Sequence, residues 1–162
     1  MIKRVLLYLA AAVAGIALAV FASQVFCITE VNGTAMEPAI GEDSSLLVNR
    51  WAYREKEPVV GDIVAFRSDI YGEEGEGSVL VRRVAGVSGD VVEIKENILY
   101  RNGKPYTEHM KEPVHMDDMD EIRLGDGEIF LLSDNRKSSL DSRNEAIGII
   151  ETEDCIGKVC FK

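Results

Sequence analysis

The feature that most constrains this chain is a charge-free apolar run near its N-terminus, residues 5–27, VLLYLAAAVAGIALAVFASQVFC. The hydrocarbon core of a bilayer is about 30 Å thick, and about 20 apolar residues in a helix cross it. The run therefore predicts a transmembrane helix. A cleaved signal peptide is the alternative, because residues 17–24 offer small residues, but a signal peptide has a shorter apolar core. The length of the run favours an uncleaved anchor.

Charge on either side of the run predicts its orientation. Lys3 and Arg4 precede it, so residues 1–28 are expected to form a short cytoplasmic end and the anchor, and residues 29–162 an extracytoplasmic domain. Without these two cations, the 18 basic residues fall to 16 against 28 acidic ones, a net charge of −12. So acidic a domain excludes nucleic acid as a partner, because phosphates are bound by basic surfaces. Contact with the lipid bilayer must then be apolar.

After the anchor, the apolar residues recur in short runs that predict β-strands. These runs are rich in Val, Ile, Phe and Tyr and are separated by Gly, Asp and Asn. Asn102-Gly103 between two of them is the strongest short signal for a hairpin. We therefore expect a mainly β domain behind one transmembrane helix, with strands within residues 44–53, 61–68, 78–87, 90–104, 127–134 and 155–161.

Two polar segments, residues 71–78 and 107–121, are expected to be surface loops. The second contains His109 and His115 among several acids, but their spacing matches no defined metal site. We predict no metal and no cofactor. Three cysteines are too few for a disulfide framework, and whether Cys155 and Cys160 pair is left open.

Four segments behind the anchor resemble, in order, the sequence boxes of the type I signal peptidases, membrane-bound serine proteases that remove signal peptides from exported proteins. VNGTAMEPAI at 31–40 resembles the serine box, Gly-x-Ser-Met-x-Pro. GDIVAF at 61–66 resembles the next box, and VRRVAGVSGD at 81–90 resembles the lysine box. SDNRKSSLDSR at 133–143 resembles the last box. Four ordered boxes are far more specific than any one of them.

The resemblance implies a serine nucleophile activated by a lysine. A serine hydroxyl needs a neighbouring base, and a lysine serves when burial keeps it neutral. In the last box, Ser139 matches the residue that orients this lysine, and Asp141 and Arg143 match a supporting pair. The serine-box N–H also helps to bind the oxyanion. The loop and groove edge would be formed by Gly33, Ala35, Met36 and Pro38.

Both reacting positions depart from the family pattern. Ala35 stands at the serine position and Arg82 at the lysine position. An alanine has no atom that attacks a carbonyl, and an arginine stays protonated. Ser133 replaces the usual glycine of the last box. We therefore predict that the chain as written is inactive.

The substitutions mainly affect the two reacting positions, since the other box residues largely keep the family pattern. This suggests a natural non-catalytic member that binds signal-peptide-like or pilin-like segments, like relatives that assist pilus assembly. The alternative is an active signal peptidase I, a serine endopeptidase, shown with inactivating substitutions at positions 35 and 82. An arginine is an unusual choice for a deliberate inactivation, which favours the natural member.

The guanidinium of Arg82 needs compensation in a pocket shaped for a neutral amine, because a buried charge requires hydrogen-bonded partners. We expect its head to reach Ser139 or a carboxylate, or to extend to the solvent edge of the groove. In either case it should stay within a side-chain length of the Ala35 methyl group.

Overall fold

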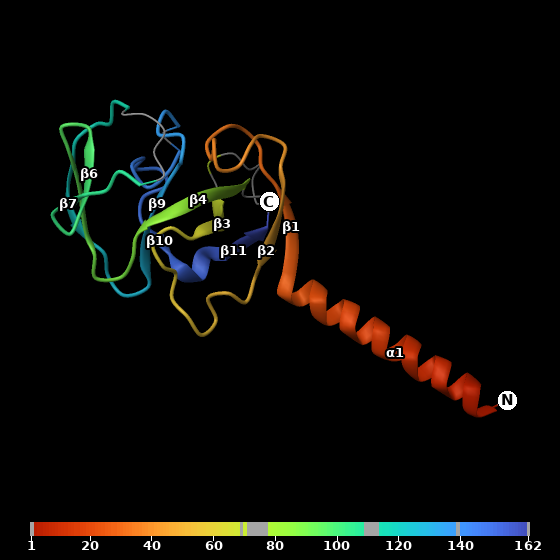
Figure 1. The fold of residues 1–162 in the computed structure, drawn as a ribbon. Coiled ribbons are helices and arrows are strands. Elements are labelled where there is room, and N and C mark those ends of the chain that lie inside the picture. The colour runs from red at the N-terminus through yellow and green to blue at the C-terminus, as the bar shows by residue number, and fades with distance from the viewer. Residues whose placement is uncertain (1, 69, 71–77, 109–113, 139, 162) are drawn as a thin grey trace.

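The N-terminal helix stands apart from a body made almost entirely of strands (Figure 1). The computed structural model describes residues 2–68, 70, 78–108, 114–138 and 140–161. Helix α1 (Ile2–Val25) has 24 residues, none of them buried. At about 1.5 Å per residue, such a helix exceeds the thickness of a bilayer core. In length and composition it is therefore able to cross a membrane, as the apolar run predicted.

A seven-stranded antiparallel sheet forms the part of the body next to α1. Its strand order is β1-β2-β11-β3-β4-β9-β10, so the last strand of the chain lies between two early ones. Short apolar runs give these strands, with buried and more exposed residues alternating in β2. The strands are β1 (Phe26–Glu30), β2 (Ser45–Asn49), β3 (Ile63–Ser68), β4 (Ser78–Gly86), β9 (Glu128–Leu132), β10 (Ile150–Glu151) and β11 (Cys155–Phe161), with the short helix η2 (Thr152–Asp154) before β11.

A second sheet of four strands, in the order β7-β6-β5-β8, lies on the side of the body away from α1 (Figure 1). It comprises β5 (Val91–Lys95), β6 (Ile98–Arg101), β7 (Lys104–Pro105) and β8 (Met119–Arg123). Asn102 and Gly103 join β6 to β7 with φ angles of 53° and 72°. These left-handed angles suit a tight hairpin, so the predicted turn is confirmed.

Three groups of buried apolar side chains hold the body together. One group joins the serine-box loop, residues 31–40, to the large sheet, with Met36 and Ile40 packed among Leu46, Val48 and Val81. A second lies between the two sheets, and a third packs on the other face of the large sheet around Val64 and Phe66. The expectation of a mainly β domain behind one apolar helix is confirmed.

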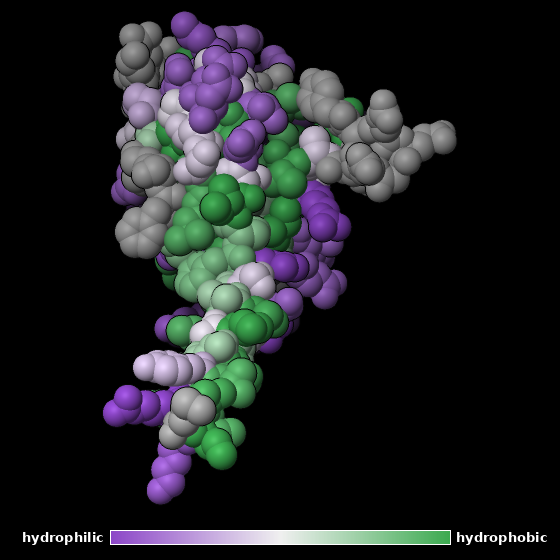
Figure 2. All heavy atoms as spheres, turned by 90° about the vertical axis from the view of Figure 1, so that its right-hand side faces the viewer, coloured by the Kyte–Doolittle hydropathy of each residue, from purple (hydrophilic) through white to green (hydrophobic). Residues whose placement is uncertain are grey.

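Contacts at the end of α1 join the helix to the turn after β2. The N–H of Arg50 donates to the carbonyl of Val25 at 2.8 Å, and the rings of Phe21 and Trp51 meet edge to face with centroids 5.4 Å apart. Figure 2 shows apolar side chains covering α1 and the adjoining part of the body. Ile28 of β1, 74% exposed, belongs to the exposed apolar residues of the chain. An apolar surface of this kind is suited to contact a bilayer, whereas the acidic surface of the domain is not.

Gly157 lies where β11 bulges between β2 and β3. We expect a substitution at this position to lower the stability of the fold strongly. A Cβ atom there would lie 2.2 Å from the carbonyl oxygen of Asn49, a backbone atom that cannot turn away. We expect Gly157→Ala to lower the free energy of unfolding by more than about 2 kcal/mol in a denaturant titration. Gly41→Ala is the control, because its Cβ would meet nothing closer than 3.9 Å. Equal stability of the two variants would contradict this description of the bulge.

Candidate functional site

The serine-box loop is anchored by two apolar side chains and leaves its central residue partly accessible. Met36 is fully buried and Ile40 is 1% exposed, and the N–H of Ile40 donates to the carbonyl of Met36 at 2.8 Å. Gly33 has a φ of 91°, which lets the chain turn before the loop. Ala35 is half-buried, and the Glu37-Pro38 peptide after it is cis. The loop thus presents a methyl group where the family has a hydroxyl.

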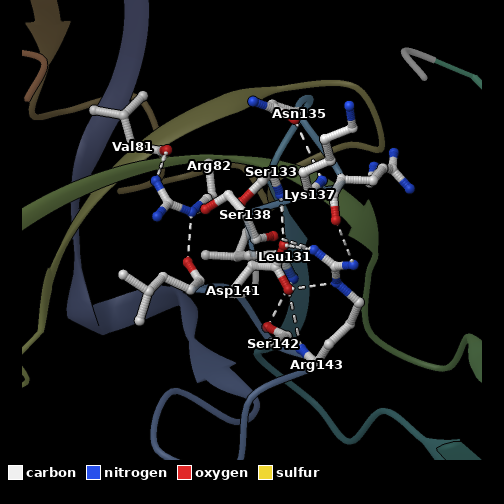
Figure 3. Close-up of polar contacts among 12 residues, drawn as sticks. Val81, Arg82, Leu131, Ser133, Asn135, Lys137, Ser138, Asp141, Ser142 and Arg143 are labelled. Carbon is white, nitrogen blue, oxygen red and sulfur yellow. Dashed lines mark hydrogen bonds and ion pairs between the residues drawn. The ribbon is translucent and has the colours of Figure 1, made fainter. Parts of the chain in front are cut away.

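Arg82 lies in β4 and is only 4% exposed. Its Nε donates to the carbonyl of Leu140 at 2.6 Å, and its Nη1 donates to the carbonyl of Val81 at 2.6 Å (Figure 3). Burial lowers the pKa of Arg82, whereas the charge of Asp141 opposes this shift. Among the described residues the head donates to two main-chain carbonyls, whereas Ser139, a carboxylate or the solvent edge was expected. Ser139 itself lies outside the described residues.

Asp141 is fully buried and organises the last box. Its Oδ2 accepts the N–H of Ser133 at 2.9 Å, and its two oxygens accept from Nε and Nη2 of Arg143 at 2.8 and 2.7 Å (Figure 3). Arg143 also donates to the carbonyls of Arg136 and Ser138. The hydroxyl of Ser133 is buried and has no hydrogen-bond partner in the described part of the chain. The pair thus holds the main chain of the last box at Ser133, Arg136 and Ser138.

A second buried pair connects three of the boxes. Arg83 donates from Nε and Nη2 to the two oxygens of Asp134 at 2.7 and 2.6 Å, and from Nη1 to the carbonyl of Gly61 at 2.8 Å. Their side chains are 9% and 1% exposed. The sequence showed these residues as retained box positions but indicated no partner for either. Retention of an Arg and an Asp in separate boxes was the only available signal.

Asn135 brings the last box to the serine box. Its N–H donates to the carbonyl of Ala35 at 2.9 Å, and its Nδ2 donates to the carbonyl of Thr34 at 3.2 Å. Because Leu140 of the same segment accepts from Arg82, residues 133–143 contact both altered positions. The resulting arrangement has neither a hydroxyl at position 35 nor a deprotonatable amine at position 82.

The histidines and cysteines are the remaining candidate residues from the sequence. Within the described residues, no group of three or more His, Cys, Asp and Glu side chains could hold a metal ion. His109 lies outside them, and His115 contacts Asn97, with 2.7 Å between Nδ1 and Oδ1. Cys155 and Cys160 are both free thiols, and burial raises the pKa of Cys155 to about 12.

Comparison with known proteins decides the family. A family model described as signal peptidase, peptidase S26, matches residues 1–162. The chain belongs to this signal peptidase family. Among curated signal peptidases, Signal peptidase I V of Bacillus subtilis is 31% identical over 90% of this chain and 93% of its own length. The "Probable signal peptidase I-1" of Synechocystis sp. is 30% identical over 79% of this chain and 66% of its own length, so the match spans just under two thirds of that protein.

A solved signal peptidase I from Enterococcus faecalis agrees with the fold. It superposes with a TM-score of 0.51 at 25% identity, over 65% of this chain and 98% of that one. The resemblance drawn from the four boxes is therefore confirmed at the level of the signal peptidase family and of its β-domain. The roles of individual site residues, and the division at residue 28, remain predictions.

Proposed function

We propose that this signal peptidase family member binds signal-peptide-like segments at the outer surface of the membrane without cleaving them. The observation that carries the proposal is the state of Arg82. Its guanidinium is buried and donates to two carbonyls, so the position of the family base holds a group that does not accept a proton. The methyl group of Ala35 at the nucleophile position supports the same conclusion.

Peptide binding depends on groups that these substitutions leave in place. β4 pairs with β3 from Ser78 to Arg83. On its other side, β4 pairs with β9 only from Arg83 onward. In the described part of the chain, residues 78–80 thus have no strand neighbour on this side, whereas the carbonyl of Val81 already accepts from Arg82. An extended segment adds to such an edge through main-chain hydrogen bonds. Val81 packs beside Met36 of the serine-box loop, which places this edge next to the site.

The proposed location and partners follow from the anchor and the family. The N-terminus would lie in the cytoplasm, α1 would span the cell membrane, and the β body would lie outside. Lys3 and Arg4 support this orientation. Signal peptides are the substrates implied by the family, and pilin-like segments with a similar apolar helix are a narrower candidate. Both would reach the edge of β4 from the bilayer surface.

The test is a binding and cleavage measurement on the full chain in detergent. A fluorescent signal peptide should bind in an anisotropy titration, and mass spectrometry should find no cleaved product. Val79→Asp, at the open edge of β4 and 38% exposed, should weaken binding about tenfold or more, because a charge would be placed against the added strand.

Val59→Asp is the matched control, since Val59 is also an exposed valine, at 59%, and lies outside β4. It should leave the affinity within about twofold. Equal effects of the two substitutions would exclude the β4 edge as the binding site. Cleavage at one defined bond that persists in Ser133→Ala and Ser139→Ala variants would exclude a purely binding role.

A further inference from the structure

Arg136 is a buried cation, and two of its three side-chain nitrogen atoms have no hydrogen-bond partner among the described residues. It is 3% exposed, and its Nη2 reaches the carbonyl of Glu108 at 3.4 Å, which is long for a hydrogen bond. Its Nε and Nη1 are buried and have no hydrogen-bond partner among the described residues. Nearby acids are engaged elsewhere, since Asp134 binds Arg83 and Asp141 binds Arg143.

The electrostatic surroundings make this arrangement unfavourable. Burial lowers the pKa of Arg136, the positive charge of Arg143 lowers it further, and the charge of Asp141 opposes both effects. A buried charge without a partner lowers the stability of a folded protein. An acceptor that entered from outside would remove much of this penalty, and a carboxylate is the best match because it can bind a guanidinium through two parallel hydrogen bonds.

Two surface hollows adjoin Arg136. One of about 480 Å³ is lined by Glu37, Pro38 and Gly41 of the serine-box loop and by residues 134–137. The other, of about 870 Å³, lies along β8 and residues 142–149. Arg136, Lys137 and Val114 line both hollows. The first residue of the serine-box loop that lines the smaller hollow, Glu37, is two positions after Ala35.

Asn135 connects this hollow to the site itself. It lines the smaller hollow, and its N–H donates to the carbonyl of Ala35 at 2.9 Å. The hollow therefore adjoins the main chain at position 35, within reach of a polypeptide bound there. Asp134 is neutralised by Arg83, so the lining keeps Arg136 and Lys137 against Glu37 alone. This balance favours an acidic side chain over a basic one.

We propose that Arg136 selects an Asp or Glu side chain in the stretch of the bound polypeptide that follows the Ala35 site. The inference rests on the proposed function, because it assigns a specificity to the same polypeptide-binding site. The carboxylate would accept from Nε and Nη1, the two donors left unused, after a small movement of the side chain into the smaller hollow. Lys137, exposed at the rim, would attract the same group from solution.

Two signal peptides that differ only by Asp against Asn in this following stretch test the proposal. The full chain in detergent should bind the Asp peptide about tenfold more tightly in an anisotropy titration, because a desolvated charge-assisted pair is formed. Arg136→Met should bind both peptides equally. Lys137→Met, the exposed neighbour, should keep most of the preference. Equal binding of both peptides to the unmodified chain would overturn the inference and leave the proposed function standing.

Thermal unfolding separates this role from a structural one. Arg136→Met should unfold at the same or a higher temperature, because it removes an unpaired buried charge. A marked decrease in the unfolding temperature would show that Arg136 stabilises the fold, and it would overturn the proposal.

If neither peptide binds, the proposed function fails, and acetate is then used as the probe for the carboxylate site. Sodium acetate should then raise the unfolding temperature of the unmodified chain, relative to sodium chloride at equal ionic strength, but not that of Arg136→Met. No difference between the salts would overturn the carboxylate site as well.

Discussion

Changing Ala35 to Ser and Arg82 to Lys together is expected to give this chain measurable hydrolysis of a signal peptide, about 10²-fold or more above Ala35→Ser alone. The serine supplies the missing nucleophile, and a lysine in β4 would share the buried surroundings that lower the pKa of Arg82. A lysine pKa lowered in this way makes the neutral amine available as a base. Product formation should therefore increase with pH until that amine is deprotonated, which mass spectrometry of timed samples can follow.

Two control variants make this result interpretable. Ala35→Ser alone should show no hydrolysis above background, because a protonated guanidinium leaves the hydroxyl unactivated. Ala35→Ser with Arg82→Met should stay silent too, since it has a nucleophile without a base. Activity in either would reveal another base. Silence of the double Ser and Lys variant, with peptide binding retained, would show that more than the two reacting groups has diverged.

Breaking the buried pair of Arg83 and Asp134 should produce the largest loss of stability. Arg83→Met leaves the Asp134 carboxylate, 1% exposed, without its two donors, and it also removes the hydrogen bond to the carbonyl of Gly61. Truncating one partner of a buried ion pair costs about 3–5 kcal/mol. Urea unfolding followed by the fluorescence of Trp51, the single tryptophan, measures the loss.

Replacing both partners distinguishes a lost interaction from a stranded charge. Arg83→Met with Asp134→Leu should recover much of the stability, because no unpaired charge then remains. Arg101→Met is the control, since the pair of Arg101 and Asp90 lies nearer to solvent, with the arginine side chain 33% exposed. It should cost clearly less than Arg83→Met. A similar loss in both variants would contradict the importance assigned to the three-box connection.

Local sequence patterns are sufficient to predict most helices and strands of this fold. The charge-free run gives α1, the Asn102-Gly103 pair gives the hairpin of β6 and β7, and the short apolar runs give most strands. Periodicity, turn residues and charge-free length act within a few residues, so they can be read without the rest of the chain. The order of the four boxes, too, was sufficient to identify the family.

The sequence by itself was therefore sufficient to predict the apolar helix, most strands and the family. It also showed that positions 35 and 82 hold neither a serine nor a lysine. The tertiary structure decided which groups meet. Arg83 binds Asp134 51 residues away, and Arg82 donates to the carbonyl of Leu140 58 residues away, where Ser139, a carboxylate or the solvent edge was expected. It also left Nε and Nη1 of the buried Arg136 without a hydrogen-bond partner among the described residues. Such pairings depend on the path of the backbone between distant segments and on which acids are already engaged, and no local pattern encodes either.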